Sequence, residues 1–194
     1  MGTPVFLHND EHFIYCYSKF MSEHRDNTEN TGMGLVYSGH APLEWTVSSR
    51  NLTGAQLVEN EKCLRIILAL SEYPAEPSEE LAALERKVDI TLEMVAELLR
   101  ANLNLPEPVA FDIGAHDLAW DSSEPLPATG EKVDVALYLH DLYPRPLRLK
   151  GVVKSSQASR CTVALREQSE DIQLLQEKFI FLHHRRQIHQ QRHT

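Results

Sequence analysis

The sequence contains little cysteine and no long hydrophobic run. Its 194 residues include three cysteines, Cys16, Cys63 and Cys161. Their odd number and wide spacing fit neither a disulfide framework nor a Cys-x-x-Cys metal site. The apolar stretches are far too short to span a bilayer, and the first residues lack the basic and apolar regions of a signal peptide. We therefore expect buried thiols in a reducing cytoplasm and no membrane insertion.

Positive charge is scarce as well. Lysine and arginine together number 19 against 28 acidic residues, which gives a formal net charge of −9. A general nucleic-acid-binding protein would show a basic face, and so would a protein that binds anionic membranes, so both classes are disfavoured. One basic cluster lies in HHRRQIHQQRHT, which contains Arg185 and Arg186. It either binds an anion or an acidic partner, or it is the solvated end of a helix.

Recognisable catalytic motifs are missing too. The sequence has no Gly-x-Ser-x-Gly, no phosphate-binding loop and no His-Glu-x-x-His. Its histidines do not supply three metal ligands at a fixed spacing. We therefore expect a protein that is not an enzyme and that has neither a metal nor a resident cofactor.

Apolar residues at every second position indicate several β-strands. The first is residues 42–48, PLEWTVS. The others are VAFDI, LAW, KVDVALYLH, PLRLKGVV and CTVALR. In two of these, the residues expected to face inward are Val133, Val135, Leu137, Leu139, Leu147, Leu149 and Val152. Gly151 suggests a bulge or bend, and the spacing of the strands predicts an antiparallel barrel or sandwich.

Three helices are predicted between and after these strands. Thr53 and Gln56 have the spacing of a capping box, which starts a helix that ends before Pro74. A second helix covers residues 79–102, and a third begins at Ser169. The prediction is an α+β domain at residues 41–190, with a helical hairpin inserted at 51–104 after the first strand and a C-terminal helix at 168–190. Residues 1–40 form an N-terminal segment whose structure the sequence does not reveal.

The second helix carries the strongest local pattern. Apolar residues recur at alternating steps of three and four, as in the a and d positions of a heptad. They are Leu81, Leu84, Val88, Val95 and Leu98, with Thr91 between them. The helix either packs on its own domain or joins helices of other subunits, and the broad apolar stripe suits a bundle better than a two-stranded zipper.

The stretch FDIGAHDLAW, residues 111–120, places two acids and a histidine around a glycine between two strands. Asp112, His116 and Asp117 could form the rim of a ligand site. They could equally belong to a tight turn, because residues this close along a turn usually point in different directions.

Five segments together resemble the atypical, tetramer-forming branch of the PilZ domains, a family of cyclic di-GMP receptors. They are PLEW, LERKVDITLEMVAELL, PVAFDIGAHDLAW, the pair KVDVALYL and PLRLKGVV, and EKFIFLHHRRQI. The resemblance implies a six-stranded antiparallel barrel with a C-terminal helix, and long helices that bundle the subunits into a tetramer. It also makes cyclic di-GMP, a bacterial second messenger, a possible ligand.

The sequence departs from the two nucleotide-binding motifs of the usual PilZ domain. The first motif is Arg-x-x-x-Arg, whereas only Arg25 precedes Pro42. The second is Asp/Asn-x-Ser-x-x-Gly, where Asp112 matches but Gly114 replaces the serine and Asp117 replaces the glycine. A carboxylate at that last position would lower the affinity for an anionic ligand.

Two hypotheses about function follow. In the first, the chain is a non-enzymatic oligomeric PilZ-type protein of bacterial cyclic di-GMP signalling that acts through an unidentified protein partner, with degenerate nucleotide motifs. In the second, it is a genuine receptor that binds the dinucleotide at a rearranged site on the barrel. Candidate contacts at such a site are Asp112, Arg25, Arg185 and Arg186.

Overall fold

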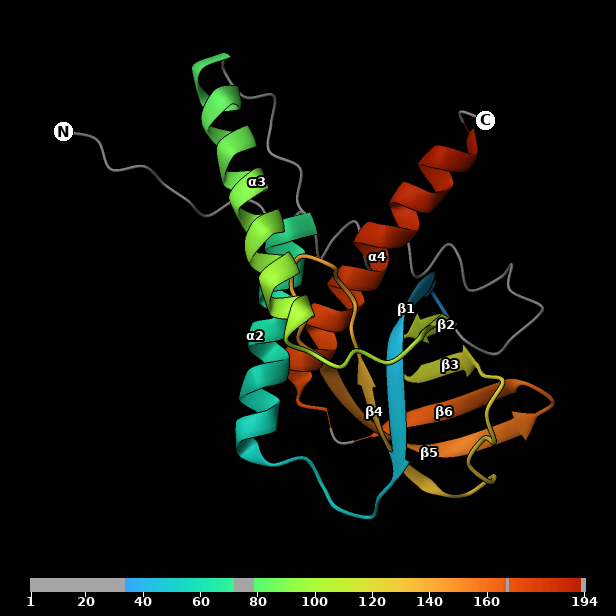
Figure 1. Ribbon diagram of the computed structural model, residues 1–194. Coiled ribbons are helices and arrows are strands. Elements are labelled where there is room, and N and C mark those ends of the chain that lie inside the picture. The colour runs from blue at the N-terminus through green and yellow to red at the C-terminus, as the bar shows by residue number, and fades with distance from the viewer. Residues whose placement is uncertain (1–33, 72–78, 167, 193–194) are drawn as a thin grey trace. The chain divides into compact units, whose positions relative to one another are not determined.

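Six antiparallel strands close into a barrel in this computed structural model, which describes residues 34–71, 79–166 and 168–192 (Figure 1). Around the barrel the strands follow the order β1–β2–β3–β6–β5–β4. They are β1 Val36–Val47, β2 Pro108–Gly114, β3 Asp117–Asp121, β4 Lys132–Leu137, β5 Leu147–Gln157 and β6 Arg160–Arg166. The described helices are α2 Gly54–Ser71, α3 Glu79–Ala101 and α4 Glu170–Arg192. The predicted α+β class is confirmed, with two helices between β1 and β2 and one after the barrel.

The first strand begins earlier than the sequence pattern suggested. Residues 36–42 of β1 pair with β2, and residues 43–47 pair with β4. The expected start at Pro42 and the expected domain boundary at residue 40 therefore both fall inside β1. The inward positions of its first half include Gly39 and Ala41, so no run of large apolar residues marks them. A Cβ at Gly39 would lie 3.0 Å from the ring of Phe111, which fills the space instead.

The predicted alternation holds for β4 and fails at one place in β5. Val133, Val135 and Leu137 are buried, as a strand with one face toward the core requires. In β5 the inward residue after Leu149 is Gly151 and the next is Val153, so Val152 is not the core residue that we expected. The β-bulge lies between Val153 and Ser155. At Gly151 the backbone of β6 comes close, since an added Cβ would collide with Val163 and would lie 2.6 Å from the carbonyl oxygen of Ala164.

The helix α2 begins with the capping box that the sequence predicted. The Thr53 N–H donates to Gln56 Oε1 at 2.9 Å, and the Gln56 N–H donates to Thr53 Oγ1 at 3.3 Å. Both bonds satisfy backbone N–H groups that have no partner within the first turn of a helix. Farther along, the buried Asn60 donates to the Arg148 carbonyl oxygen at 2.7 Å and accepts from the Arg148 N–H at 2.9 Å. These two bonds tie α2 to β5.

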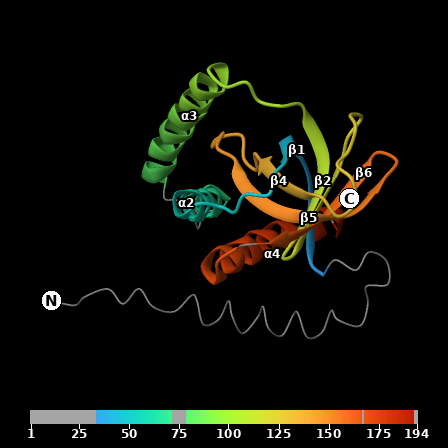
Figure 2. The ribbon, with the colours of Figure 1, turned by 90° about the horizontal axis from the view of Figure 1, so that it is seen from below.

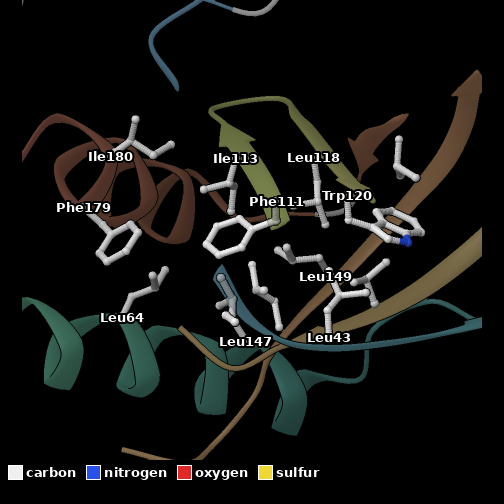
Figure 3. Close-up of a cluster of buried hydrophobic side chains, with 14 of the residues drawn as sticks. Leu43, Leu64, Phe111, Ile113, Leu118, Trp120, Leu147, Leu149, Phe179 and Ile180 are labelled. Carbon is white, nitrogen blue, oxygen red and sulfur yellow. The ribbon is translucent and has the colours of Figure 1, made fainter. Parts of the chain in front are cut away.

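The hydrophobic core runs without interruption from the barrel to the two helices beside it. Figure 3 shows Leu64 of α2 and Phe179 of α4 beside Phe111, which belongs to the barrel. Complete burial of a leucine or phenylalanine side chain contributes about 1.5–3 kcal/mol. Helix α4 starts at its predicted cap, where the Ile172 N–H donates to Ser169 Oγ at 3.3 Å. It then packs against α2, β1 and β2 (Figure 2).

Two of the three cysteines lie in this core as free thiols. Burial raises the pKa of Cys63 to about 12 and the pKa of Cys161 to about 11. Both side chains therefore stay protonated at neutral pH and behave as small apolar groups. The expectation of buried thiols is confirmed for these two residues, while Cys16 lies outside the described residues.

We expect Gly151→Ala to destabilise the barrel, because the added methyl group must displace either Val163 or the backbone of β6. Overpacking of this kind costs about 1–3 kcal/mol. Urea unfolding should show a lower midpoint. Gly54→Ala is the matched control, since nothing lies within 4 Å of its Cβ position, and its midpoint should be unchanged or slightly higher. Equal midpoints for the two variants would contradict the close approach of β5 and β6.

Candidate functional site

A cluster of charged side chains lies on the outer face of the barrel around Asp112. The neighbours Phe111 and Ile113 point into the core, so the side chain of Asp112 between them points outward. The register of β1 and β2 places Ser38 directly opposite Asp112. The Ser38 hydroxyl donates to Asp112 Oδ1 at 2.5 Å. The carboxylate is thus engaged on one side by its cross-strand neighbour.

Arg160 on β6 completes this cluster. Its Nη2 forms an ion pair with Asp112 Oδ2, and its Nη1 donates to Asp121 Oδ1 at 2.9 Å. Partial burial disfavours the charged guanidinium, but the hydrogen bonds and negative charges of Asp121 and Asp112 outweigh it and raise the pKa of Arg160. Two carboxylates therefore share one guanidinium, and the cluster of Asp112, Arg160 and Asp121 carries a net charge of about −1.

A buried side chain of α4 holds the turn between β2 and β3 in place. Gln176 of α4 is fully buried, and its Nε2 donates to the Gly114 carbonyl oxygen at 2.8 Å. Its Oε1 accepts from Gln168 Nε2 at 2.8 Å. A buried amide that forms both bonds stabilises one geometry of the turn, because an unpaired buried amide is costly.

The two other polar residues of this turn have separate partners. Asp117 pairs with Lys154 of β5 at 2.9 Å. The ring of His116 lies 3.4 Å from Gln173 of α4. Asp112, His116 and Asp117 therefore do not converge on one ligand, which agrees with the tight-turn reading. The negative charge of Asp117 is offset by Lys154, so its expected repulsion of an anion is weaker than the sequence alone suggested.

Sequence reasoning missed Arg160 and Gln176. Gln176 had a detectable signal, because it is a polar residue in the apolar stripe between Ile172 and Phe179. Arg160 had none, since it comes 48 residues after Asp112 and reaches it only through the pairing of β3 with β6.

The candidate arginines of α4 have structural contacts of their own. Arg186 Nη2 donates to the Ser71 carbonyl oxygen at the C-terminal end of α2. There the helix leaves carbonyl groups unpaired and carries a partial negative charge. The guanidinium of Arg185 lies 5.7 Å from the centre of the Phe181 ring. The structure thus pairs Asp112 with Arg160 and uses Arg186 to join two helices, while Arg25 lies outside the described residues.

His183 lies beside Arg186 at the same junction of α2, α4 and β1. Its ring packs on Tyr37 and Phe179, with centroid distances of 4.8 and 4.4 Å. Its Nε2 lies 3.3 Å from the Ser71 hydroxyl. Burial, together with the positive charge of Arg186 and the proximity of His140, lowers the pKa of His183 to about 4. The ring is therefore neutral at physiological pH.

The helix α3 exposes the apolar residues that the heptad pattern singled out. Leu81, Leu84, Val88, Val95 and Leu98 are 47–66 % exposed. Ile90, Met94 and Leu99 are exposed as well and widen this surface. The seam is therefore not buried within the described part of its own chain, in contrast to the core-facing residues of α2 and α4.

Comparison with known proteins identifies the family of this chain. A family profile described as "Atypical PilZ domain, cyclic di-GMP receptor" matches residues 68–193, more than half of the chain. The chain belongs to the atypical PilZ domain family. One similar solved structure is a pathogenic protein from Xanthomonas campestris, described as a new tetrameric PilZ domain that self-assembles via an unusual helical bundle.

The likeness to that structure concerns the fold of the PilZ domain. The TM-score is 0.64 at 18 % sequence identity, over 87 % of this chain and 97 % of the other. No curated protein matches the sequence. No catalytic family is indicated by the match. Within the described residues, no helix is long and apolar enough to cross a bilayer, and no group of three or more histidine, cysteine or acidic side chains could hold a metal ion.

The lowered pKa of His183 predicts how the stability of this PilZ domain depends on pH. The neutral ring is favoured in the folded chain, so its stabilising effect is complete above the unfolded pKa of about 6.5 and is lost as the pH falls toward 4. In His183→Gln the side chain retains a hydrogen-bonding group for Ser71 but cannot titrate. The wild type should therefore lose its stability advantage over this variant between pH 6.5 and pH 4. A stability difference that stays constant across that interval would contradict a buried neutral ring.

Proposed function

We propose that this protein is a non-enzymatic, oligomeric PilZ-type component of bacterial cyclic di-GMP signalling that acts through contacts with other proteins. The observation that carries the proposal is the exposed apolar surface of α3. Monomeric soluble proteins rarely expose a large contiguous apolar patch, and such a patch usually marks an interface. The buried free thiols Cys63 and Cys161 suit the reducing cytoplasm, where we place the protein.

The pattern along α3 favours copies of the same helix as its first partners. The residues Leu81, Leu84, Val88, Val95 and Leu98 follow a heptad, which is the repeat that packs one helix against another. Exposed residues beside the seam widen the stripe beyond a simple two-stranded contact. The similar Xanthomonas campestris protein is described as a tetramer assembled by a helical bundle. We therefore propose that four subunits of this chain join through α3.

The charges around Asp112 argue against direct, tight binding of cyclic di-GMP at that position. The ligand carries two phosphate groups, whereas the cluster of Asp112, Arg160 and Asp121 is itself negative by about one charge. A phosphate that bound Arg160 would compete with two carboxylates already in place. Gly114 also provides no hydroxyl where the usual PilZ motif has a serine. The nucleotide motifs are therefore degenerate in our proposal.

Arg160 is the one observation that favours the alternative, a genuine receptor with a rearranged site. Its planar guanidinium lies on the outer face beside Asp112, and guanidinium groups both pair with phosphates and stack on bases. In that case Asp112 and Arg160 would form the site, with Arg185 and Arg186 left in their helix contacts.

We expect Val88→Asp combined with Val95→Asp to reduce the mass of the assembly, because two carboxylates would be buried in the bundle without partners. Light scattering should show smaller particles, while circular dichroism shows an intact fold, since both valines are exposed in the single chain. The control combines Val58→Asp with Leu174→Asp. These residues are at least as exposed but lie on α2 and α4, and their substitution should leave the mass unchanged. An unchanged mass for the α3 variant would contradict the proposed bundle.

Calorimetry with cyclic di-GMP separates the two functions. The first predicts no saturable heat that depends on Asp112 and Arg160, whereas the alternative predicts such heat with a dissociation constant of about 10 µM or tighter. If heat is observed, Asp112→Asn and Arg160→Gln should abolish it, and Asp134→Asn on another strand should not. Saturable binding that depends on Asp112 and Arg160 would replace the first function by the second.

A further inference from the structure

Four cationic residues, three on barrel strands and one in the segment that follows β1, line one hollow. The hollow has a volume of about 350 Å³ and lies on the outer face of β4, β5 and β6, where the segment that follows β1 forms part of its lining. Its polar lining comprises Ser48, Ser49, Arg50, Lys132, Lys150 and Arg166. None of the described residues that line it is acidic. This is an unusual concentration of positive charge for a chain with a formal net charge of −9.

The strand register creates this arrangement. Lys150 of β5 lies directly opposite Arg166 of β6, and Lys132 of β4 lies directly opposite Val152 of β5. Like charges directly opposite each other across two strands are destabilising. Asp134 of β4 lies directly opposite Lys150 on its other side and offsets its charge, so the stability of the barrel explains Lys150 but not the further cation at Arg166.

The hollow retains most of its positive charge. Lys150 is only 7 % exposed and pairs with Asp134. Arg50, Lys132 and Arg166 pair with no carboxylate of a described residue. Three positive charges thus converge on a concave surface with low-dielectric walls, which concentrates their field and attracts anions.

The segment at the rim is held in place by its own hydrogen bonds. The Ser48 N–H donates to the Lys132 carbonyl oxygen at 2.9 Å, which extends the pairing of β1 with β4. The Arg50 N–H donates to Ser48 Oγ at 3.3 Å. Because of these bonds, the chain positions Arg50 beside the start of β4 before any ligand arrives, so less ordering is required when one binds.

We propose that this hollow binds a small molecule that carries phosphate groups. Lysine and arginine form strong charge-assisted hydrogen bonds with phosphate oxygens, and serine hydroxyls can donate further bonds. The volume lies within the range of small-molecule sites and exceeds what one phosphate ion needs, so a diphosphate or a phosphorylated metabolite fits the chemistry. The site shares no residue with the Asp112 cluster or with α3, so this proposal and the proposed function can be tested independently.

Calorimetry with sodium pyrophosphate tests the site, with sodium chloride of equal ionic strength as the reference titration. We expect saturable binding with a dissociation constant of about 1 mM or tighter. Lys132→Gln combined with Arg166→Gln should weaken it at least about tenfold, because two hydrogen bonds to a charged ligand are lost. The control, Lys62→Gln with Arg65→Gln, removes one lysine and one arginine from the exposed face of α2, and its affinity should match the wild type.

Two further measurements keep the test decisive. In the wild type, pyrophosphate should shift the amide NMR signals of Ser49 and Gly151, which does not depend on the folding of any variant. Flotation with phosphatidic acid vesicles, compared with phosphatidylcholine vesicles, distinguishes a lipid phosphate from a soluble one, and we expect no vesicle binding. The proposal fails if pyrophosphate does not bind, if both double variants lose affinity equally, or if only the vesicles are bound.

Discussion

The packing of α2 and α4 against the closed barrel is the contact on which the other features depend. Leu64, Phe111 and Phe179 come from three different elements and share one buried cluster. Because this core is continuous, the strands cannot shift their register without exposing large apolar side chains. Asn60 and Gln176 add hydrogen bonds from the two helices to the strand backbone at β5 and at the β2–β3 turn. The barrel surface is thereby fixed in one arrangement.

That fixed register determines the chemistry of the outer face. It neutralises most of the charge around Asp112 by bringing Arg160 and Lys154 to the acids of β2 and β3. On β4, β5 and β6 it has the opposite effect and gathers cations around a hollow. The acidic and the basic surface are therefore consequences of the same strand pairing, although the chain as a whole is acidic.

The helix α3 contrasts with the rest of the domain. Helices α2 and α4 bury their apolar faces in the core, whereas α3 leaves its heptad residues exposed. We propose that this exposed apolar surface supplies an interface with other subunits without involving the barrel. In our proposal the barrel provides a rigid platform and α3 provides the assembly.

The sequence by itself determined the local elements, because their signals lie within a few residues of one another. The period of two in residues 132–137, the caps at Thr53 and Ser169 and the heptad of α3 were all readable and were found where they were expected. The first half of β1 was not readable, since Gly39 makes room for Phe111 and the small residues Gly39 and Ala41 leave no apolar pattern.

Only the tertiary structure decided which distant side chains meet. Arg160 reaches Asp112, and Lys150 lies opposite Arg166, through strand pairings between segments far apart in the sequence. It also decided that Gly151 faces the backbone of β6 and does not mark the bulge. Such contacts depend on register, and register follows from the total burial of the core and not from any single stretch of the chain.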